Sequence, residues 1–313
     1  MQKKEMMVRT IHLMRRRRIV IKLPGHSERA FRRISGLCLI AMLLAVLPGC
    51  AWLDTRMREI VYRPSPERQA DFAGLRPGDL SFATAVPGEI EGTQDSLQMW
   101  WLPHTDAQAP ALLYLHGTFR NLYRNIGKID ALREAGFSVL AVDYRGWGES
   151  SPIVPSEQTI YADAAVAWTE LVRRQPDPRK RVIYGHSVGG GVAIELASRK
   201  RHGIDYGALI VESTFTRLPD VAAANGVMGT ILAGFSTQKF DSIDKIGKVD
   251  APILMIHGSD DNTVPISLGR ELRDAAPVNT RWVEIAGGSH SSLQNDFPEI
   301  YRQTLRSFAE QLR

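Results

Sequence analysis

The segment from 182 to 190 constrains the fold of this chain more than any other stretch. It reads Val-Ile-Tyr-Gly-His-Ser-Val-Gly-Gly and places the pattern Gly185-x-Ser187-x-Gly189 between an apolar, strand-like run and a helix-like run. The glycines lack a Cβ atom, so a strand and a helix can approach closely around a strained serine. The pattern therefore predicts a sharp strand-to-helix turn that exposes the Ser187 hydroxyl at the amino end of a helix, where the helix dipole favours negative charge.

Short apolar runs alternate with longer amphipathic stretches over residues 79–313. Such alternation indicates βαβ units and a mostly parallel sheet, with an antiparallel hairpin at its front. Residues 214–250 depart from the alternation and are expected to form a small insert with two short helices. Residues 50–78 are polar and punctuated by prolines, which indicates a tether with a short docking segment. The expected strands are 80–86, 96–102, 111–115, 138–142, 181–184, 208–211, 253–256 and 281–285, and the expected helices are 121–135, 160–174, 188–201, 266–276 and 298–312.

The first 49 residues differ in charge from the rest of the chain. They hold eleven of the 39 Lys and Arg residues and two of the 34 Asp and Glu residues, which leaves 28 basic and 32 acidic residues in 50–313. A mildly acidic remainder gives no basis for nucleic-acid binding. Residues 34–47 form an uncharged apolar run of about 14 residues, which is short for a membrane span and suits the apolar region of a signal peptide.

The apolar run ends at residues 47–50, which read Leu-Pro-Gly-Cys and resemble a bacterial lipobox. The resemblance implies that residues 1–49 are a signal peptide and that Cys50 receives a diacylglycerol and becomes the mature N-terminus. Pro48 departs from the small or β-branched residue usual at its position. An uncleaved membrane anchor is the alternative. Ala51 gives no retention signal of the aspartate type, so we expect a lipid-anchored protein of the cell envelope, at an outer membrane and facing the periplasm.

Four further motifs follow predicted strands. They are residues 116–118 (His-Gly-Thr), 143–150 (Asp-Tyr-Arg-Gly-Trp-Gly-Glu-Ser), 257–265 (His-Gly-Ser-Asp-Asp-Asn-Thr-Val-Pro) and 287–290 (Gly-Gly-Ser-His). With the serine motif they resemble the landmarks of the α/β-hydrolase family, in order, and most closely its small-capped serine aminopeptidase-like and dienelactone hydrolase-like members. The resemblance implies an α/β-hydrolase fold, a mostly parallel eight-stranded sheet flanked by helices, with a small insert after the sixth strand.

The same motifs contain the residues of a catalytic triad. A serine hydroxyl is a poor nucleophile at neutral pH and needs a base, most often a histidine held by a buried carboxylate. The chain order of the family is serine, acid, histidine, which implies Ser187 as nucleophile, Asp261 as acid and His290 as base. The family pattern Gly-x-x-Asp-x-x-Val-Pro favours Asp261 over Asp260. Glu212, at the end of another predicted strand, is the outside alternative for the acid.

A tetrahedral intermediate needs two hydrogen-bond donors for its oxyanion. We expect the N–H groups of Val188 and Thr118 to supply them, with Phe119 as the alternative to Thr118. The other histidines near the motifs are expected to hold loop backbone or to pack against the oxyanion loop: His116, His186 and His257.

The expected function is hydrolysis of carboxylic esters or thioesters through an acyl-enzyme on Ser187. Water then releases the acid, so neither a cofactor nor a metal is expected, and the sequence offers no metal-ligand motif. The expected partners are a small-molecule or acyl-lipid substrate and a membrane reached through the N-terminal lipid; the oligomeric state is left open. Two alternatives stay open: a serine peptidase or amidase of the aminopeptidase-like type, and a non-catalytic envelope lipoprotein that keeps the hydrolase scaffold.

Overall fold

The computed structural model describes residues 52–226, 229 and 236–312. Residues 53–313 make up one compact unit, separate from residues 1–52. The predicted signal peptide and Cys50 lie outside the described residues. Among the helices of the described ranges, none is both long and apolar enough to cross a bilayer.

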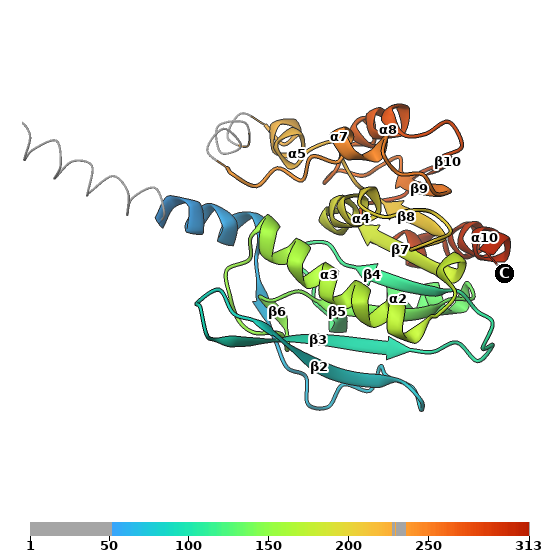
Figure 1. Ribbon diagram of the computed structural model, residues 1–313. Helices are drawn as coiled ribbons and strands as arrows, with labels where there is room; N and C mark the ends of the chain where they lie inside the picture. The colour runs from blue at the N-terminus through green and yellow to red at the C-terminus, as the bar shows by residue number, and fades with distance from the viewer. Residues whose placement is uncertain (1–51, 227–228, 230–235, 313) are drawn as a thin grey trace, which may run out of the picture. The chain divides into compact units, whose positions relative to one another are not determined.

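An eight-stranded sheet forms the centre of the unit, in the order β10-β9-β8-β7-β4-β5-β3-β2 (Figure 1). Strand β3 runs antiparallel to β2 and β5, and the remaining neighbours pair in parallel. The predicted sheet is thus confirmed, including the hairpin at its front. Its strands are β2 (Leu80–Pro87), β3 (Gln94–Leu102), β4 (Ala111–Leu115), β5 (Ser138–Asp143), β7 (Arg181–His186), β8 (Ala208–Glu212), β9 (Ile253–Gly258) and β10 (Arg281–Ile285).

Helices cover both faces of the sheet, which explains why its central strands are apolar throughout. In β4, Leu113 and Leu115 join a core with α3, α4 and α8, whereas Leu112 and Tyr114 face the opposite core with α2 and α10. All five residues of β4 are buried, as expected for a strand covered on both sides. The helices named here are α2 (Leu122–Glu134), α3 (Glu157–Arg174), α4 (Val188–Ser198), α8 (Ile266–Ala275) and α10 (Pro298–Ala309).

The predicted insert lies between β8 and β9. Its described part contains the two short helices α5 (Leu218–Ala224) and α7 (Ile243–Ile246). Residues 227–228 and 230–235 are outside the described part of the chain. The insert is small, in agreement with the sequence-based expectation.

The sequence predicts a tether with a short docking segment over residues 50–78; in the structure residues 53–72, which we name the N-terminal strap, pack against the folded unit. Residues 52–62 are helical, and Met57 and Tyr62 in this helix are buried. The Tyr62 ring packs edge-on against Trp147 and Phe240, and its hydroxyl donates to Gln238 Oε1 at 2.8 Å. The two aromatic contacts explain the docking, because they remove a large apolar side chain from water.

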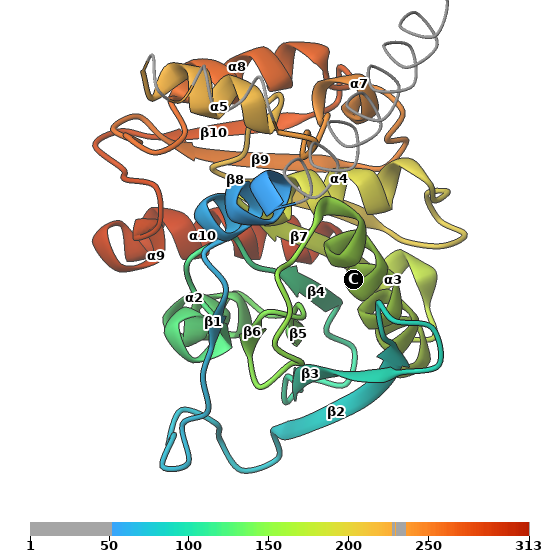
Figure 2. The ribbon, with the colours of Figure 1, turned by 90° about the vertical axis from the view of Figure 1, so that its left-hand side faces the viewer.

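Beyond its helix the strap continues along the body of the unit. Residues Ser65–Pro66 form the short strand β1, which pairs in parallel with β6 (Trp147–Gly148). Figure 2 shows the helix in front of the sheet, with β1 descending beside β6. The strap therefore belongs to the folded unit and lies on the side toward which the arrow of β7 points in Figure 1.

Candidate active site

Ser187 occupies the sharp turn between β7 and α4 that the sequence predicts. Its backbone is left-handed, with φ 56° and ψ −122°, a strained conformation for a residue with a side chain. A Cβ at position 185 would lie 2.0 Å from the Gly189 carbonyl oxygen, so only glycine fits there. Ser187 is the N-cap residue of α4, yet its hydroxyl makes no capping hydrogen bond and remains available for other partners.

The structure brings Ser187, His290 and Asp261 together. Ser187 Oγ lies 3.0 Å from His290 Nε2, and His290 Nδ1 lies 2.7 Å from Asp261 Oδ2. The three residues follow three different strands, β7, β10 and β9, and converge at the carboxyl edge of the sheet. A carboxylate at Nδ1 fixes the proton on that nitrogen and leaves Nε2 as an acceptor for the serine hydroxyl.

Asp261 is held as a carboxylate by its surroundings. Its Oδ1 accepts hydrogen bonds from the N–H groups of Thr263 (2.9 Å) and Val264 (2.8 Å), and His257 Nε2 lies 3.3 Å from its Oδ2. Burial raises the pKa of this carboxyl, but hydrogen bonds from His257 and His290 outweigh burial and hold the pKa well below its usual range. The negative charge therefore persists at neutral pH.

The two alternative acids lie elsewhere. Asp260 is exposed and accepts a hydrogen bond from the neighbouring Ser259 hydroxyl. Glu212 is fully buried and bonded to Lys128, Tyr184 and Tyr301. Neither the Asp260 carboxylate nor the Glu212 carboxylate contacts His290.

A buried ion pair between Glu212 and Lys128 lies beside the serine turn. Their side chains are 0% and 3% exposed, and Lys128 Nζ also donates to Gln294 Oε1 at 2.8 Å. Burial would raise the pKa of Glu212, but the Lys128 ammonium outweighs it and lowers that pKa to about 2. The backbone oxygen of Glu212 accepts a hydrogen bond from the Ser187 N–H at 2.9 Å. The Lys128–Glu212 ion pair is therefore connected to the serine turn through the backbone of Glu212.

A cavity of about 190 Å³ opens over Ser187 and His290 and is lined by Gly117, Thr118 and Phe119 on its other side. A Cβ at Gly117 would lie 2.9 Å from Ser187 Cβ, so the loop after β4 runs directly against the serine. Phe119 has a left-handed φ of 73°. The expected oxyanion residue Thr118 thus lines the reaction cavity, as does its alternative Phe119, while Val188 is the buried first residue of α4.

The remaining histidines of the motifs hold backbone. His186 Nε2 lies 2.9 Å from the His290 carbonyl oxygen, His116 Nδ1 lies 2.6 Å from that of Gly117, and His257 Nε2 lies 3.0 Å from that of Val264. Desolvation lowers the pKa of His186 to about 3, so this ring is neutral at physiological pH. It therefore orients the loop that carries His290 without adding positive charge.

Several supporting residues have no motif in the sequence. Thr214 Oγ1 donates to the Ser187 carbonyl oxygen at 2.9 Å, and Lys128 holds Glu212 across 84 residues of chain. The only sequence signal for Lys128 is its position three and four residues from Asn125 and Leu132 on the buried face of α2, and a lysine there is easily read as a solvent-facing residue.

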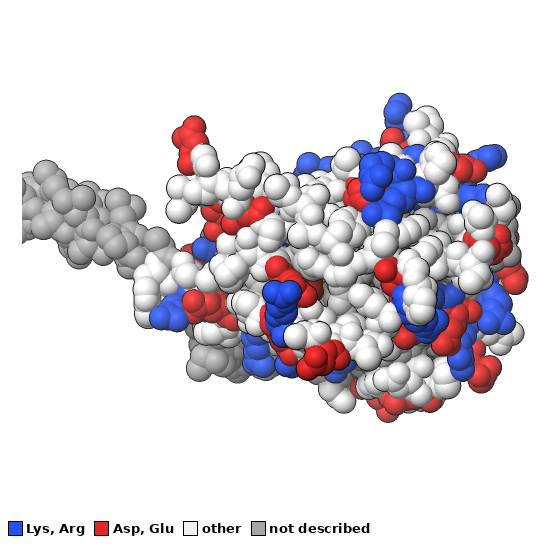
Figure 3. All heavy atoms as spheres, turned by 90° about the horizontal axis from the view of Figure 1, so that it is seen from below, with Lys and Arg blue, Asp and Glu red and all other residues white. Residues whose placement is uncertain are grey.

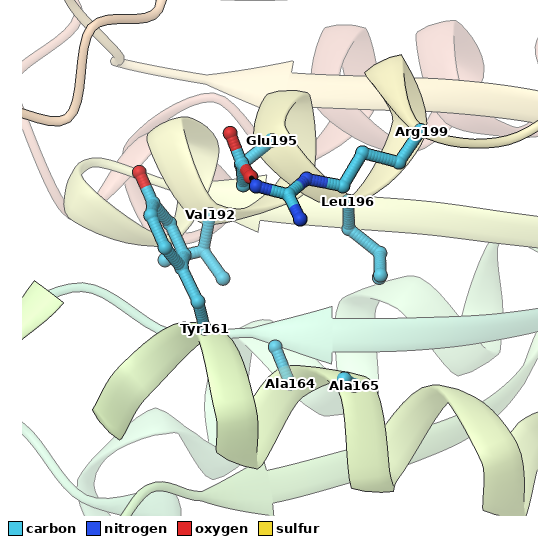
Figure 4. A pocket seen from close by; sticks show the side chains of 7 residues that line it. All are labelled: Tyr161, Ala164, Ala165, Val192, Glu195, Leu196 and Arg199. Carbon is cyan, nitrogen blue, oxygen red and sulfur yellow. Dashed lines mark ion pairs between the residues drawn. The ribbon is translucent and has the colours of Figure 1, made fainter. Parts of the chain in front are cut away.

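A second cavity, of about 110 Å³, lies between α3 and α4. Figure 4 shows the Glu195–Arg199 ion pair on one side of it and Tyr161 on the other. Its lining contains neither a nucleophile with a base nor a residue of the triad. The Ser187 cavity is therefore the candidate active site.

The described residues contain no group of three or more His, Cys, Asp or Glu side chains arranged to hold a metal ion. The face seen in Figure 3 carries Lys and Arg interspersed with Asp and Glu, without a continuous basic surface among the residues described there.

Comparisons with known proteins found one family model and several relatives that match this chain. The family model described as "Serine aminopeptidase, S33" matches residues 107–242. An uncharacterized protein of Mycobacterium tuberculosis is 32% identical over 284 residues, which cover 89% of this chain and 96% of that protein. The lysophosphatidylserine lipase ABHD12 of Danio rerio is 31% identical over 192 residues, covering 56% of this chain and 50% of the lipase.

Solved structures share the fold at low sequence identity. The Pyrococcus furiosus esterase Pf2001 aligns with a TM-score of 0.61 and 17% identity, over 79% of this chain and 97% of that one. An α/β hydrolase from Vibrio vulnificus aligns with a TM-score of 0.57 and 20% identity, over 72% of this chain and 81% of that one. Together with the sheet order and the strand-to-helix serine turn, these structures show that the chain has the α/β-hydrolase fold.

Proposed function

We propose that this protein is a serine hydrolase that cleaves carboxylic ester or thioester bonds through an acyl-enzyme on Ser187. The observation that carries the proposal is the continuous chain of contacts from Ser187 Oγ to His290 Nε2 (3.0 Å) and from His290 Nδ1 to Asp261 Oδ2 (2.7 Å). This arrangement provides a nucleophile, a base and a group that orients the base.

The mechanism follows from the geometry. Ser187 Oγ attacks the acyl carbonyl while His290 Nε2 takes the hydroxyl proton, and Asp261 stabilises the resulting imidazolium. His290 then gives the proton to the leaving alcohol or thiol, which departs and leaves the acyl group on Ser187. A water molecule, deprotonated by His290, attacks this ester and releases the acid, so the enzyme returns to its starting state.

The negative oxygen of each tetrahedral intermediate needs donors preorganised in the cavity. In our proposal the Val188 N–H, at the amino end of α4, supplies one, and the Thr118 N–H supplies the other, with Phe119 as the alternative. Losing one such donor typically costs about 3 kcal/mol of transition-state stabilisation. Support comes from the loop after β4, which packs Gly117 against the serine and lines the cavity with Thr118 and Phe119.

The lining of the cavity favours an acyl ester over a peptide with a free N-terminus. An aminopeptidase binds a substrate ammonium group, for which a carboxylate is the natural partner. Among the described residues that line the Ser187 cavity, none is Asp or Glu, and Arg120 is present. The proteins similar to this chain include a lysophosphatidylserine lipase and an esterase, which supports the same choice.

We also propose that the protein is anchored by a lipid on Cys50 and faces the periplasm from the outer membrane. This proposal rests on the apolar run 34–47 and the Leu-Pro-Gly-Cys sequence that ends it. Cys50→Ala should move the full chain from the membrane fraction to the soluble fraction. Unchanged fractionation of this variant would contradict lipidation at Cys50.

Labelling with a fluorophosphonate probe tests the proposed chemistry, because the probe reacts with an activated serine and forms a stable adduct. We expect wild-type protein to be labelled and Ser187→Ala to be unlabelled, with Ser213→Ala, a change at another buried serine, as the matched control. Absence of labelling in the wild type would favour the non-catalytic scaffold. Rates on p-nitrophenyl esters of graded length and on aminoacyl arylamides then separate an esterase from an amidase.

A further inference from the structure

Exposed large apolar side chains are concentrated near the start of the folded unit. Nine large hydrophobic residues are exposed among those the structure describes, and three of them, Trp52, Leu53 and Ile60, fall within nine residues of the N-terminal helix. Ile60 is 56% exposed. Such a concentration differs from the isolated exposed apolar residues of an ordinary surface, which need no explanation.

The spacing of these residues puts them on one face of the helix. Leu53, Arg56 and Ile60 follow one another at intervals of three or four residues, so they share the outward side, and Arg63 follows directly after the helix ends at residue 62. The side opposite Ile60 faces the folded unit through Tyr62, which is buried. The helix thus carries apolar side chains on both sides, and its outer side also carries the Arg56–Glu59 ion pair (2.6 Å), charged groups that suit the level of the lipid headgroups.

The exposed face continues to the mouth of the reaction cavity. Arg63 lies with its guanidinium 4.7 Å from the centre of the Phe119 ring. Phe119 is 43% exposed and lines the cavity that contains Ser187 and His290. Figures 1 and 2 both place the helix beside the end of the sheet where β7 leads into α4.

The sequence before the helix indicates what covers this face. The apolar run 34–47 ends five residues before Trp52, and the proposed lipid site Cys50 is two residues before it. A helix rises 1.5 Å per residue, so Ile60 is on the order of 12 Å along the helix from Trp52. A lipid on Cys50, or an uncleaved apolar run, would hold the first turns of the helix near the surface of a bilayer.

We propose that the outer face of the N-terminal helix, together with Phe119, docks on the lipid bilayer and opens the Ser187 cavity toward it. The enzyme then takes a bilayer-borne acyl ester without the substrate crossing bulk water. Trp52 suits this position because tryptophan concentrates at membrane interfaces. The inference rests on the proposed hydrolase function and on membrane attachment, and it adds the orientation of the enzyme and the class of its substrate.

The test uses the full-length chain reconstituted in phosphatidylcholine and phosphatidylglycerol vesicles. Rates are measured on a fluorogenic long-chain acyl ester dissolved in the bilayer and on a short water-soluble p-nitrophenyl ester. Ile60→Glu is the test variant. Ile204→Glu is the matched control, because Ile204 is 57% exposed and precedes β8, at the opposite end of the sheet.

We expect Ile60→Glu to lose roughly tenfold of its rate on the bilayer ester, which corresponds to the loss of one buried apolar side chain. It should keep its rate on the soluble ester, which also shows that it folds, and Ile204→Glu should keep both rates. Equal bilayer rates for Ile60→Glu and wild type, with normal soluble activity, would overturn the docking inference alone. Absence of both activities in the wild type, without probe labelling, would instead overturn the hydrolase function.

Discussion

Removing one partner of the buried Lys128–Glu212 pair should destabilise the protein far more than removing a partner of an exposed pair. Both side chains are almost fully buried, so Glu212→Gln leaves a buried ammonium without its counter-charge, and Lys128→Met leaves a buried carboxylate. Breaking such a pair typically costs about 3–5 kcal/mol of unfolding free energy. At about 2–4 °C per kcal/mol for a unit of this size, the melting temperature should fall by roughly 6–20 °C.

Thermal unfolding of the purified full chain, followed by circular dichroism, measures this effect. Glu284→Gln is the matched control, because it breaks an exposed ion pair with Arg270. The side chains of Arg270 and Glu284 are 47% and 34% exposed. Exposed pairs contribute about 0–1 kcal/mol, so the control should shift the melting temperature only slightly. The double variant Lys128→Met/Glu212→Gln should be more stable than the sum of the single effects predicts. Equal shifts for Glu212→Gln and Glu284→Gln would refute the reasoning.

The same pair should also make the folding stability of the protein depend on pH in the acid range. The pKa of Glu212 is about 2 in the fold, against an ordinary value of 4.5. A carboxyl group whose pKa is lower in the folded protein stabilises the fold fully when the pH is above its pKa in the unfolded chain. This stabilisation is lost as the pH falls through its pKa in the folded protein. About 3 kcal/mol should therefore disappear between about pH 4.5 and pH 2. In Glu212→Gln this part of the pH dependence should be absent from denaturant-unfolding curves.

Two further predictions concern the reaction cavity. Asp261→Asn should lower kcat by about 10⁴-fold on a soluble ester, because the imidazole of His290 loses the group that fixes its tautomer. The control Asp260→Asn should keep kcat within about twofold of wild type. Equal losses of kcat in both variants would contradict the assignment of the acid. Gly117→Ala places a Cβ 2.9 Å from Ser187 Cβ and should slow acylation, measured by burst kinetics, by about 10²-fold. Gly127→Ala should leave the acylation rate unchanged, because no atom lies nearer than 3.8 Å to its new Cβ.

The sequence was sufficient for the fold and for the contacts between the proposed triad residues because each of these features has a local signal. The apolar runs locate the strands, and the glycines around position 187 locate the serine turn. His290 and Asp261 lie in short motifs after other strands, and parallel strands bring their carboxyl ends to one edge. Their convergence, with contacts of 3.0 Å and 2.7 Å, follows from topology once the strands are located.

The supporting contacts lacked such a signal because they depend on packing between distant segments. Lys128 looks like an ordinary helix lysine until Glu212 is found beside it, 84 residues later. Tyr62 directly precedes a polar segment with the prolines Pro64 and Pro66, and its burial depends on Trp147 and Phe240, both far along the chain. The sequence of residues 50–78 therefore predicted a tether with a short docking segment, but it did not indicate which side chains dock or where they pack.

The strain at Ser187 explains why the supporting contacts gather where they do. A left-handed serine costs on the order of 1–3 kcal/mol and persists only where the surroundings hold it. Here the Ser187 N–H donates to the Glu212 carbonyl, and its own carbonyl accepts from the Gly190 N–H and the Thr214 hydroxyl. Glu212 is in turn fixed by Lys128. The buried pair thus acts on the serine through the backbone that follows β8, so its removal should lower the stability of the turn without removing any group that contacts the substrate.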